Sequence, residues 1–122
     1  MSEKQNDIGN RLLNFSASVV KFLSTIEVRG ASKLLSSQLL RCSTSVGANY
    51  EESRAAESRA DFIHKMQVAL KEMRETHCWL SLYKAAELVD PEEIEPIRDE
   101  ARQLRAILSK AVATAKARNP LA

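Results

Sequence analysis

Histidine and cysteine are the side chains that most often carry catalysis or bind metals, and this sequence has two of each. Asp61 and His64 are spaced like a carboxylate–histidine metal pair, but helical di-metal sites use two such pairs and two further glutamates. His77 directly precedes Cys78, and adjacent side chains on a helix do not face each other. Cys42 and Cys78 form no CxxC motif, so we interpret them as two reduced thiols buried in a helical core. We therefore expect no metal, no cofactor and no catalytic residue, and predict that the chain is not an enzyme.

A polar stripe recurs at three- and four-residue spacing after residue 37 and comprises Gln38, Arg41, Ser45, Asn49 and Glu52. It overlaps an apolar stripe, and a buried polar group without a partner costs about 1–3 kcal/mol. The candidate partners further along the chain are Glu72, Glu75 and Thr76. The stripe is a structural network, a site for a ligand or partner, or a face exposed to solvent.

Charge is distributed unevenly towards the C-terminus, although the net charge is only +2. Residues 90–100 carry six acids and one base, whereas residues 101–122 carry five bases and no acid. These bases are Arg102, Arg105, Lys110, Lys116 and Arg118. Either the charges complement the dipole of one helix, or the bases form a contact surface for the phosphate backbone of a nucleic acid.

Four segments place apolar residues every three or four positions, which is the spacing of one helix face. We expect helices at about residues 7–28, 32–56, 58–89 and 91–117. This spacing with short connections predicts an all-α fold, an antiparallel up-down four-helix bundle. The scarcity of glycine, proline and aromatic residues disfavours an all-β fold. The length of 122 residues predicts a single domain, residues 1–122.

Three local signals mark the expected helix boundaries. Gly30 follows the first apolar segment, where a glycine with positive φ commonly ends a helix. Ser58 and Asp61 have the spacing of a capping box, although one unbroken helix through this point is the alternative. Asp90 and Pro91 provide a cap and a first-turn proline for the last helix.

Small and aromatic residues point to close contacts. Gly47 lies within the second expected helix, where glycine costs about 1 kcal/mol relative to alanine, so we expect another backbone nearby, from the same chain or another subunit. Trp79 and Tyr83 are one turn apart, and are either core residues or anchors at a subunit interface.

The chain carries no signal for a membrane. No stretch approaches the roughly 20 apolar residues of a membrane span, and the first ten residues lack the apolar core of a signal peptide. We therefore expect a cytoplasmic protein with no membrane partner.

Three longer motifs carry a resemblance to a known family: QLLRCSTSVGANYEE at residues 38–52, ADFIHK at 60–65 and ALKEMRET at 69–76. Over roughly residues 8–112 the chain resembles the bacterial four helix bundle protein family, first noted as reading frames in intervening sequences of 23S ribosomal RNA genes. The resemblance implies an antiparallel four-helix bundle that assembles into a ring of five subunits. It assigns no catalytic residues, and its motif positions here are Arg41, Ser45, Asn49, Glu52, Phe62 and Glu75.

A related group, the accessory subunits of diversity-generating retroelements, shares this pentameric bundle and binds nucleic acid and a reverse transcriptase through basic surfaces. Resemblance and residues together predict a non-enzymatic homo-oligomer, a pentamer, that binds RNA or DNA through its basic surface. The alternative is an oligomeric scaffold that binds a protein partner and has no nucleic-acid role.

Overall fold

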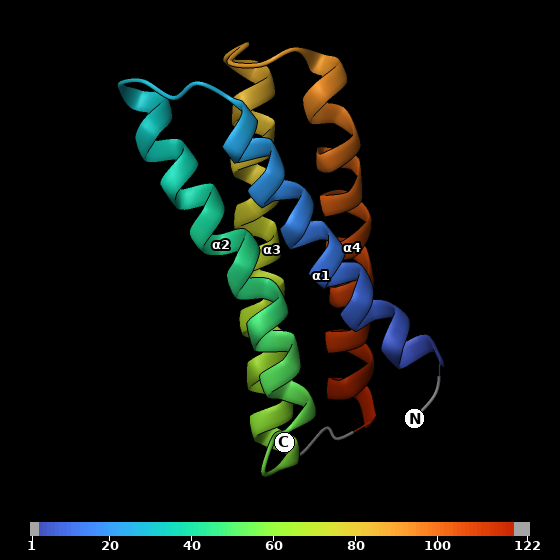
Figure 1. Cartoon of the computed structure of the whole chain (residues 1–122). Helices are drawn as coiled ribbons and strands as arrows, with labels where there is room; N and C mark the ends of the chain where they lie inside the picture. The colour runs from blue at the N-terminus through green and yellow to red at the C-terminus, as the bar shows by residue number, and fades with distance from the viewer. Residues whose placement is uncertain (1–2, 119–122) are drawn as a thin grey trace.

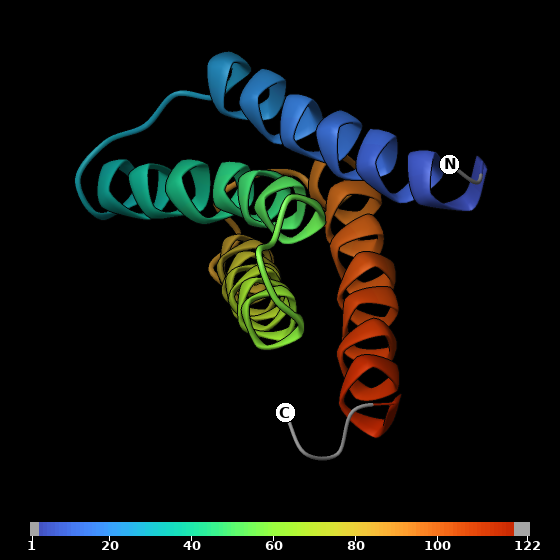
Figure 2. The same cartoon turned by 90° about the horizontal axis from the view of Figure 1, so that it is seen from below.

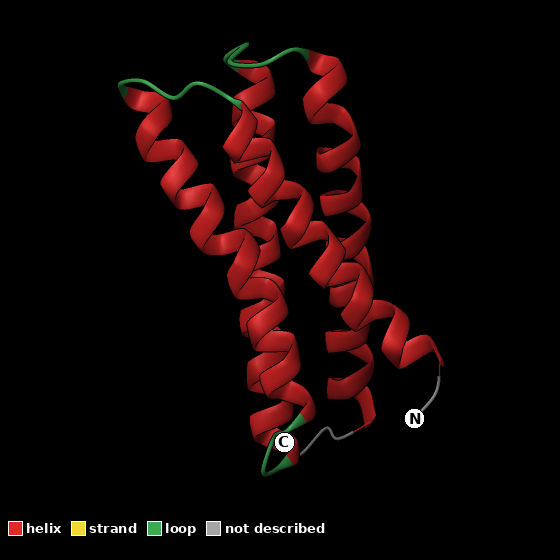
Figure 3. Cartoon of the chain, in the orientation of Figure 1, coloured by secondary structure: helices red, strands yellow, loops and turns green. Residues whose placement is uncertain are grey.

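The computed structural model describes residues 3–118, and within them the chain forms four helices and no strand (Figure 3). The helices are α1 (Glu3–Thr25), α2 (Ala31–Arg54), α3 (Arg59–Ala85) and α4 (Pro91–Arg118). Consecutive helices run in opposite directions along the molecule (Figure 1), which confirms the all-α, up-down four-helix bundle. No helix in this described part is both long and apolar enough to cross a membrane.

Each helix packs against two others. α2 and α4 both contact α1 and α3, and the view from below shows α1 lying obliquely across the bundle on the side opposite α3 (Figure 2). The apolar stripes predicted from the spacing form the core, and the side chains with the least exposure are Leu12, Val19, Leu39, Val46, Met73, Leu80, Ile94, Leu104 and Leu108. Burying each of these large side chains contributes about 1.5–3 kcal/mol.

Polar contacts fasten α1 to the other helices. Arg11 donates to both carboxylate oxygens of Glu100 over 2.9 and 2.7 Å, and to Gln103 over 2.9 Å. The Ser16 hydroxyl donates to the Ser43 carbonyl over 3.0 Å, which joins α1 to α2. Paired contacts from one guanidinium to one carboxylate fix orientation as well as distance, so Arg11 sets how α1 lies on α4.

The break between α2 and α3 is real, and the unbroken-helix alternative is wrong. Ser58 has an extended backbone and its side chain accepts from the Asp61 N–H over 3.0 Å, as a capping box requires. The Asp61 carboxylate accepts from the Glu57 N–H over 3.3 Å, one residue before the position that the motif predicts. The cap therefore fixes the start of α3 and also holds the preceding turn.

Gly30 has the expected positive φ, 53°, but it plays a different part. α1 ends at Thr25, earlier than the expected residue 28, and Gly30 lies directly before α2 with a ψ of −125°. This conformation is the mirror image of an extended one and suits only glycine. Gly30 therefore turns the chain into α2 and does not terminate α1.

α3 ends at Ala85, four residues before the expected end. The Leu88 N–H donates to the Tyr83 carbonyl and the Glu87 N–H to the Lys84 carbonyl, each over 3.1 Å. These are the two bonds of a Schellman motif, and Glu87 occupies its left-handed position with φ at 54°. Because glycine usually fills that position, the sequence gives no sign of this helix end. α4 begins at Pro91, as predicted.

Candidate functional site

Among the bonds of residues 3–118, Arg41 is the member of the polar stripe that reaches another helix. Its guanidinium donates to Glu72 over 3.2 Å and also to Glu75, both on α3. The Gln38 side chain accepts from Arg41 over 3.2 Å, and Glu75 accepts in addition from the Trp79 indole over 3.4 Å. Glu72 is buried, so the arginine supplies the charge that this carboxylate needs. The arrangement ties α2 to α3.

The rest of the stripe is satisfied locally or lies in solvent. The Asn49 amide donates to the carbonyl and the hydroxyl of Ser45, one turn earlier in α2, over 2.9 and 3.0 Å. Glu52 is exposed. Thr76, the third expected partner, is buried and donates to the Glu72 carbonyl over 2.7 Å and to the Cys42 sulfur over 3.2 Å. The stripe therefore does not converge on one point.

The two cysteines differ. Cys42 is buried, and this burial raises the pKa of its thiol. Cys78 is exposed, so the expectation that both thiols are buried is wrong. Residue 78 lies about 200° around α3 from the buried Thr76, on the side away from that threonine. His64 is also exposed, and no group of three His, Cys, Asp or Glu side chains among residues 3–118 could hold a metal ion.

Of the two aromatic residues expected as core or interface anchors, Tyr83 lies in the core. It is 1% exposed, its ring meets Phe22 edge to face at a centroid distance of 5.9 Å, and its hydroxyl bonds to that of Ser36. Burial raises the pKa of the Tyr83 hydroxyl. Trp79 is half-buried, so only Trp79 presents part of its ring at the surface.

The five bases of the C-terminal segment all lie exposed on α4, but they do not share one face. Arg102 is paired with Asp99 over 2.7 Å, and Gln103 donates to the same carboxylate over 2.8 Å. These bonds hold the pKa of Asp99 below its usual range and compensate the charge of Arg102. At about 100° per residue, Lys110 lies about 120° around α4 from Lys116, and Arg118 lies about 160° away from it.

Lys116 lines a groove between α3 and α4 with a volume of about 390 Å³, which we call the α3–α4 groove. Its lining residues are Gln67, Leu70 and Arg74 from α3, and Ser109, Val112, Ala113 and Lys116 from α4. One turn before Ser109, Arg105 lies 3.4 Å from the His77 ring nitrogen Nδ1. Sequence reasoning missed Arg74 and His77 at this surface, because only the register of α3 against α4 brings them to Arg105 and Lys116.

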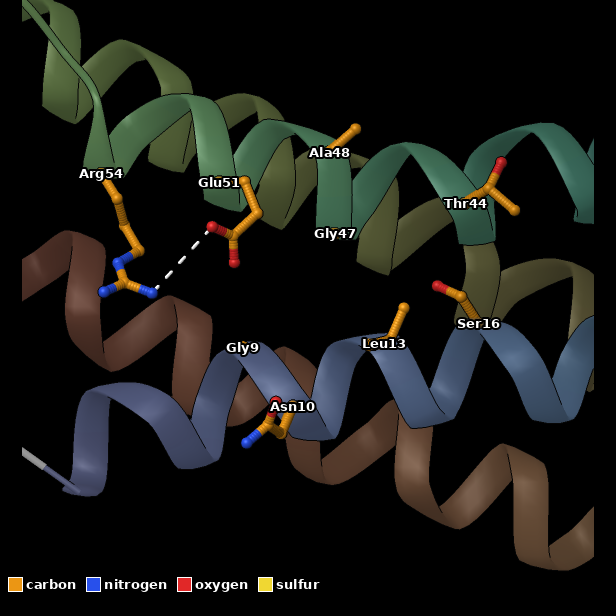
Figure 4. A pocket seen from close by; sticks show the side chains of 9 residues that line it. All are labelled: Gly9, Asn10, Leu13, Ser16, Thr44, Gly47, Ala48, Glu51 and Arg54. Atoms are coloured by element: carbon orange, nitrogen blue, oxygen red, sulfur yellow. Dashed lines mark ion pairs between the residues drawn. The ribbon is translucent and has the colours of Figure 1, made fainter.

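A second groove, the α1–α2 groove, has a volume of about 540 Å³ (Figure 4). Its lining residues are Gly9, Asn10, Leu13 and Ser16 from α1, and Thr44, Gly47, Ala48, Glu51 and Arg54 from α2. Leu13 is 67% exposed there. Apart from the neighbouring turns of α2 itself, a Cβ added to Gly47 would meet no described atom within 4 Å, so no other helix of residues 3–118 brings its backbone close to this glycine.

Comparisons with known proteins agree on one family. The family model described as 23S rRNA-intervening sequence protein matches residues 4–110. Among solved structures, the chain is similar to the crystal structure of a protein of unknown function from the S23 ribosomal protein family of Bacteroides thetaiotaomicron. The two share 35% sequence identity with a TM-score of 0.77, over 86% of this chain and 97% of that one. A search of curated proteins finds no match.

Proposed function

Because the chain belongs to the 23S rRNA-intervening sequence protein family, we propose that it is a non-enzymatic, self-assembling cytoplasmic protein that binds RNA or another nucleic acid. The observation that carries this proposal is the exposure of Arg105 and Lys116 on α4, neither of which has a carboxylate partner among residues 3–118. Unpaired surface cations attract a polyanion, and the counterions released from the nucleic acid add to the affinity.

Self-assembly would strengthen nucleic-acid binding by a surface with few cations. The family resemblance implies a ring of five subunits, and the α1–α2 groove, which is lined by small residues and the exposed Leu13, supports a subunit contact there. A ring presents the same basic face several times. Simultaneous contacts raise the overall affinity for one long RNA well above that of a single face.

Titration of RNA against salt tests the nucleic-acid function. We expect the logarithm of the association constant to fall linearly and steeply with the logarithm of salt concentration. Native mass spectrometry of the protein as isolated should show a single closed oligomer and any RNA that it retains. An absence of RNA binding at low salt contradicts the proposal.

The alternative is an oligomeric scaffold for a protein partner without a nucleic-acid role. The α1–α2 groove favours it, because the groove is lined mainly by apolar and small residues and Leu13 stands at its edge. Under this alternative, affinity purification from the source cell returns one protein at stoichiometric level, and nuclease treatment leaves that complex intact. Recovery of nucleic acid alone would contradict the scaffold.

A further inference from the structure

Three cations follow the contact line between α3 and α4. Arg74 and Lys116 line the α3–α4 groove from opposite helices, and Arg105 continues the row on α4 beside His77. The helix from Arg105 to Lys116 spans about 16 Å. Because α3 and α4 are antiparallel and His77 lies beside Arg105, Arg74, three residues before His77, lies at a level between Arg105 and Lys116. The cations therefore form a single file along the molecule.

Two acids that precede the row on α4 are already engaged with other bases. Asp99 is bonded to Arg102, and Glu95 is paired with Lys84 over 2.7 Å and with Arg98 over 3.3 Å. The Lys84 and Arg98 contacts hold the pKa of Glu95 below its usual range. Among residues 3–118, no ion pair involves a cation of the row.

His77 lies at one end of the row, beside Arg105, and two further arginines of α4 are near it. Partial burial, and then the guanidinium groups of Arg98, Arg105 and Arg102, lower the pKa of His77. An arginine can only donate, so its contact with His77 Nδ1 also requires a ring nitrogen without a proton. A bound anion would relieve this crowding of positive charge.

The lining of the groove also limits what it can recognise. Between the cations, the described lining consists of the amide of Gln67, the hydroxyl of Ser109 and the aliphatic side chains of Leu70, Val112 and Ala113. None of these lining residues carries an aromatic ring, the side chain on which successive bases of a single strand usually stack. Charged and hydroxyl groups contact phosphates and sugars, and such contacts carry no base identity.

We propose that the α3–α4 groove binds the phosphate backbone of one nucleic-acid strand, with Arg74, Arg105 and Lys116 as its contacts and no preference for base sequence. This inference rests on the proposed nucleic-acid function and names its site. A single file of cations matches the successive phosphates of one strand. In this arrangement α3 lies on one side of the strand and α4 on the other.

The chain offers a matched pair of variants for the test. Lys116→Glu and Lys110→Glu make the same charge change on the same exposed helix, six positions apart, but only Lys116 lines the groove. Fluorescence anisotropy would measure the binding of single-stranded oligo(U) and oligo(A) by the full-length protein over a series of salt concentrations. Circular dichroism and thermal melts would verify that both variants fold.

We expect Lys116→Glu to weaken binding about tenfold and to reduce the salt slope by about 0.7 for the lost phosphate contact. Lys110→Glu should stay within about twofold of the wild type, because a change away from the groove alters only the screened, longer-range field. Arg74→Glu should resemble Lys116→Glu although it lies on the other helix. Oligo(U) and oligo(A) should bind with similar affinity.

Each contrary result has a distinct meaning. Equal losses for the two lysine variants overturn the groove and leave the nucleic-acid function standing. A strong preference between the two oligonucleotides overturns the sequence-independent mode. Competition by polyglutamate as effective as that by RNA overturns the inference in favour of an acidic protein, and an absence of RNA binding by the wild type overturns both the inference and the proposed function.

Discussion

Glu87 holds the end of α3 in a conformation that costs an ordinary residue free energy. It is the one non-glycine residue among residues 3–118 with a positive φ, and the left-handed conformation costs about 1–2 kcal/mol for a residue with a Cβ. We expect Glu87→Gly to raise the free energy of unfolding by about 0.5–1 kcal/mol, because part of that gain is offset by the entropy of glycine in the unfolded chain. Urea denaturation measures the change.

Glu87→Ala is the matched control for this prediction. Alanine also lacks the carboxylate but keeps the Cβ, so its backbone stays strained in the left-handed position. Equal stability of the glycine and alanine variants would mean that the charge of Glu87, and not its backbone, decides the effect.

His77 makes the stability of the fold depend on pH. Burial and three arginines lower its pKa in the folded chain below the ordinary 6.5, so the unfolded chain binds the proton more readily. Above about pH 6.5 His77 is neutral in both states and does not lower the free energy of unfolding. As the pH falls from there towards the lowered pKa, the free energy of unfolding decreases. Chemical denaturation at several pH values between about 5 and 8 should show this decrease in the free energy of unfolding at low pH, and His77→Gln should make it smaller.

The exposed His64, on the same helix, supplies the control. His64→Gln removes an equal chemical group that no arginine of α4 contacts in the described residues. If it flattened the profile as much as His77→Gln does, the dependence would not arise from the arginines around His77.

At the scale of the helix, the apolar repeat determines most of what can be predicted. The spacing indicated four helices and their buried faces, since a period of about 3.6 residues is a local property of the sequence. The end of α3 was missed because Glu87 fills a position that glycine usually marks, and the positive φ of Gly30 was expected at the wrong helix. The backbone conformations of Gly30 and Glu87 depend on how the neighbouring turns are arranged, and the spacing of apolar residues carries no information on them.

The candidate site was predictable only in part for a related reason. The five bases of α4 lie within one acid-free segment of the sequence, which makes them recognisable, whereas Arg74 joins Lys116 through the register of two antiparallel helices. Residues three positions apart can pair on a helix, so the spacing of Arg102 and Asp99 permits their ion pair, but side-chain conformation decides whether it forms. The exposure of Cys78, by contrast, could have been read from its place outside the apolar stripe of α3.

Arg41 connects two helices through charge, and its removal isolates the buried carboxylate of Glu72. We expect Arg41→Met to lower the urea midpoint, because the methionine retains the aliphatic length but leaves Glu72 and Glu75 without their common partner. Adding Glu72→Gln to that variant should restore part of the loss, since a neutral amide needs no counterion. Gln38→Ala, which removes only a neutral acceptor of Arg41, should change the midpoint little.

At the scale of the whole molecule, Leu13 and Leu34 offer a test of assembly. They are 67% and 68% exposed, and only Leu13 lines the α1–α2 groove. If subunits meet at this groove, Leu13→Lys should reduce the mass measured by light scattering, because it buries a charge at the contact. Leu34→Lys should leave the mass unchanged, and equal effects of the two variants would place the contact elsewhere.

The unequal exposure of the two cysteines has a practical result for biophysics. Cys42 is sealed in the core, whereas Cys78 is open to solvent and follows His77 directly in α3. A maleimide dye would therefore attach at one natural position, one turn beyond Arg74. Cys78 thus gives the natural sequence a labelling position near the row of cations. Fluorescence of a dye on Cys78 can follow binding at the α3–α4 groove without an engineered cysteine.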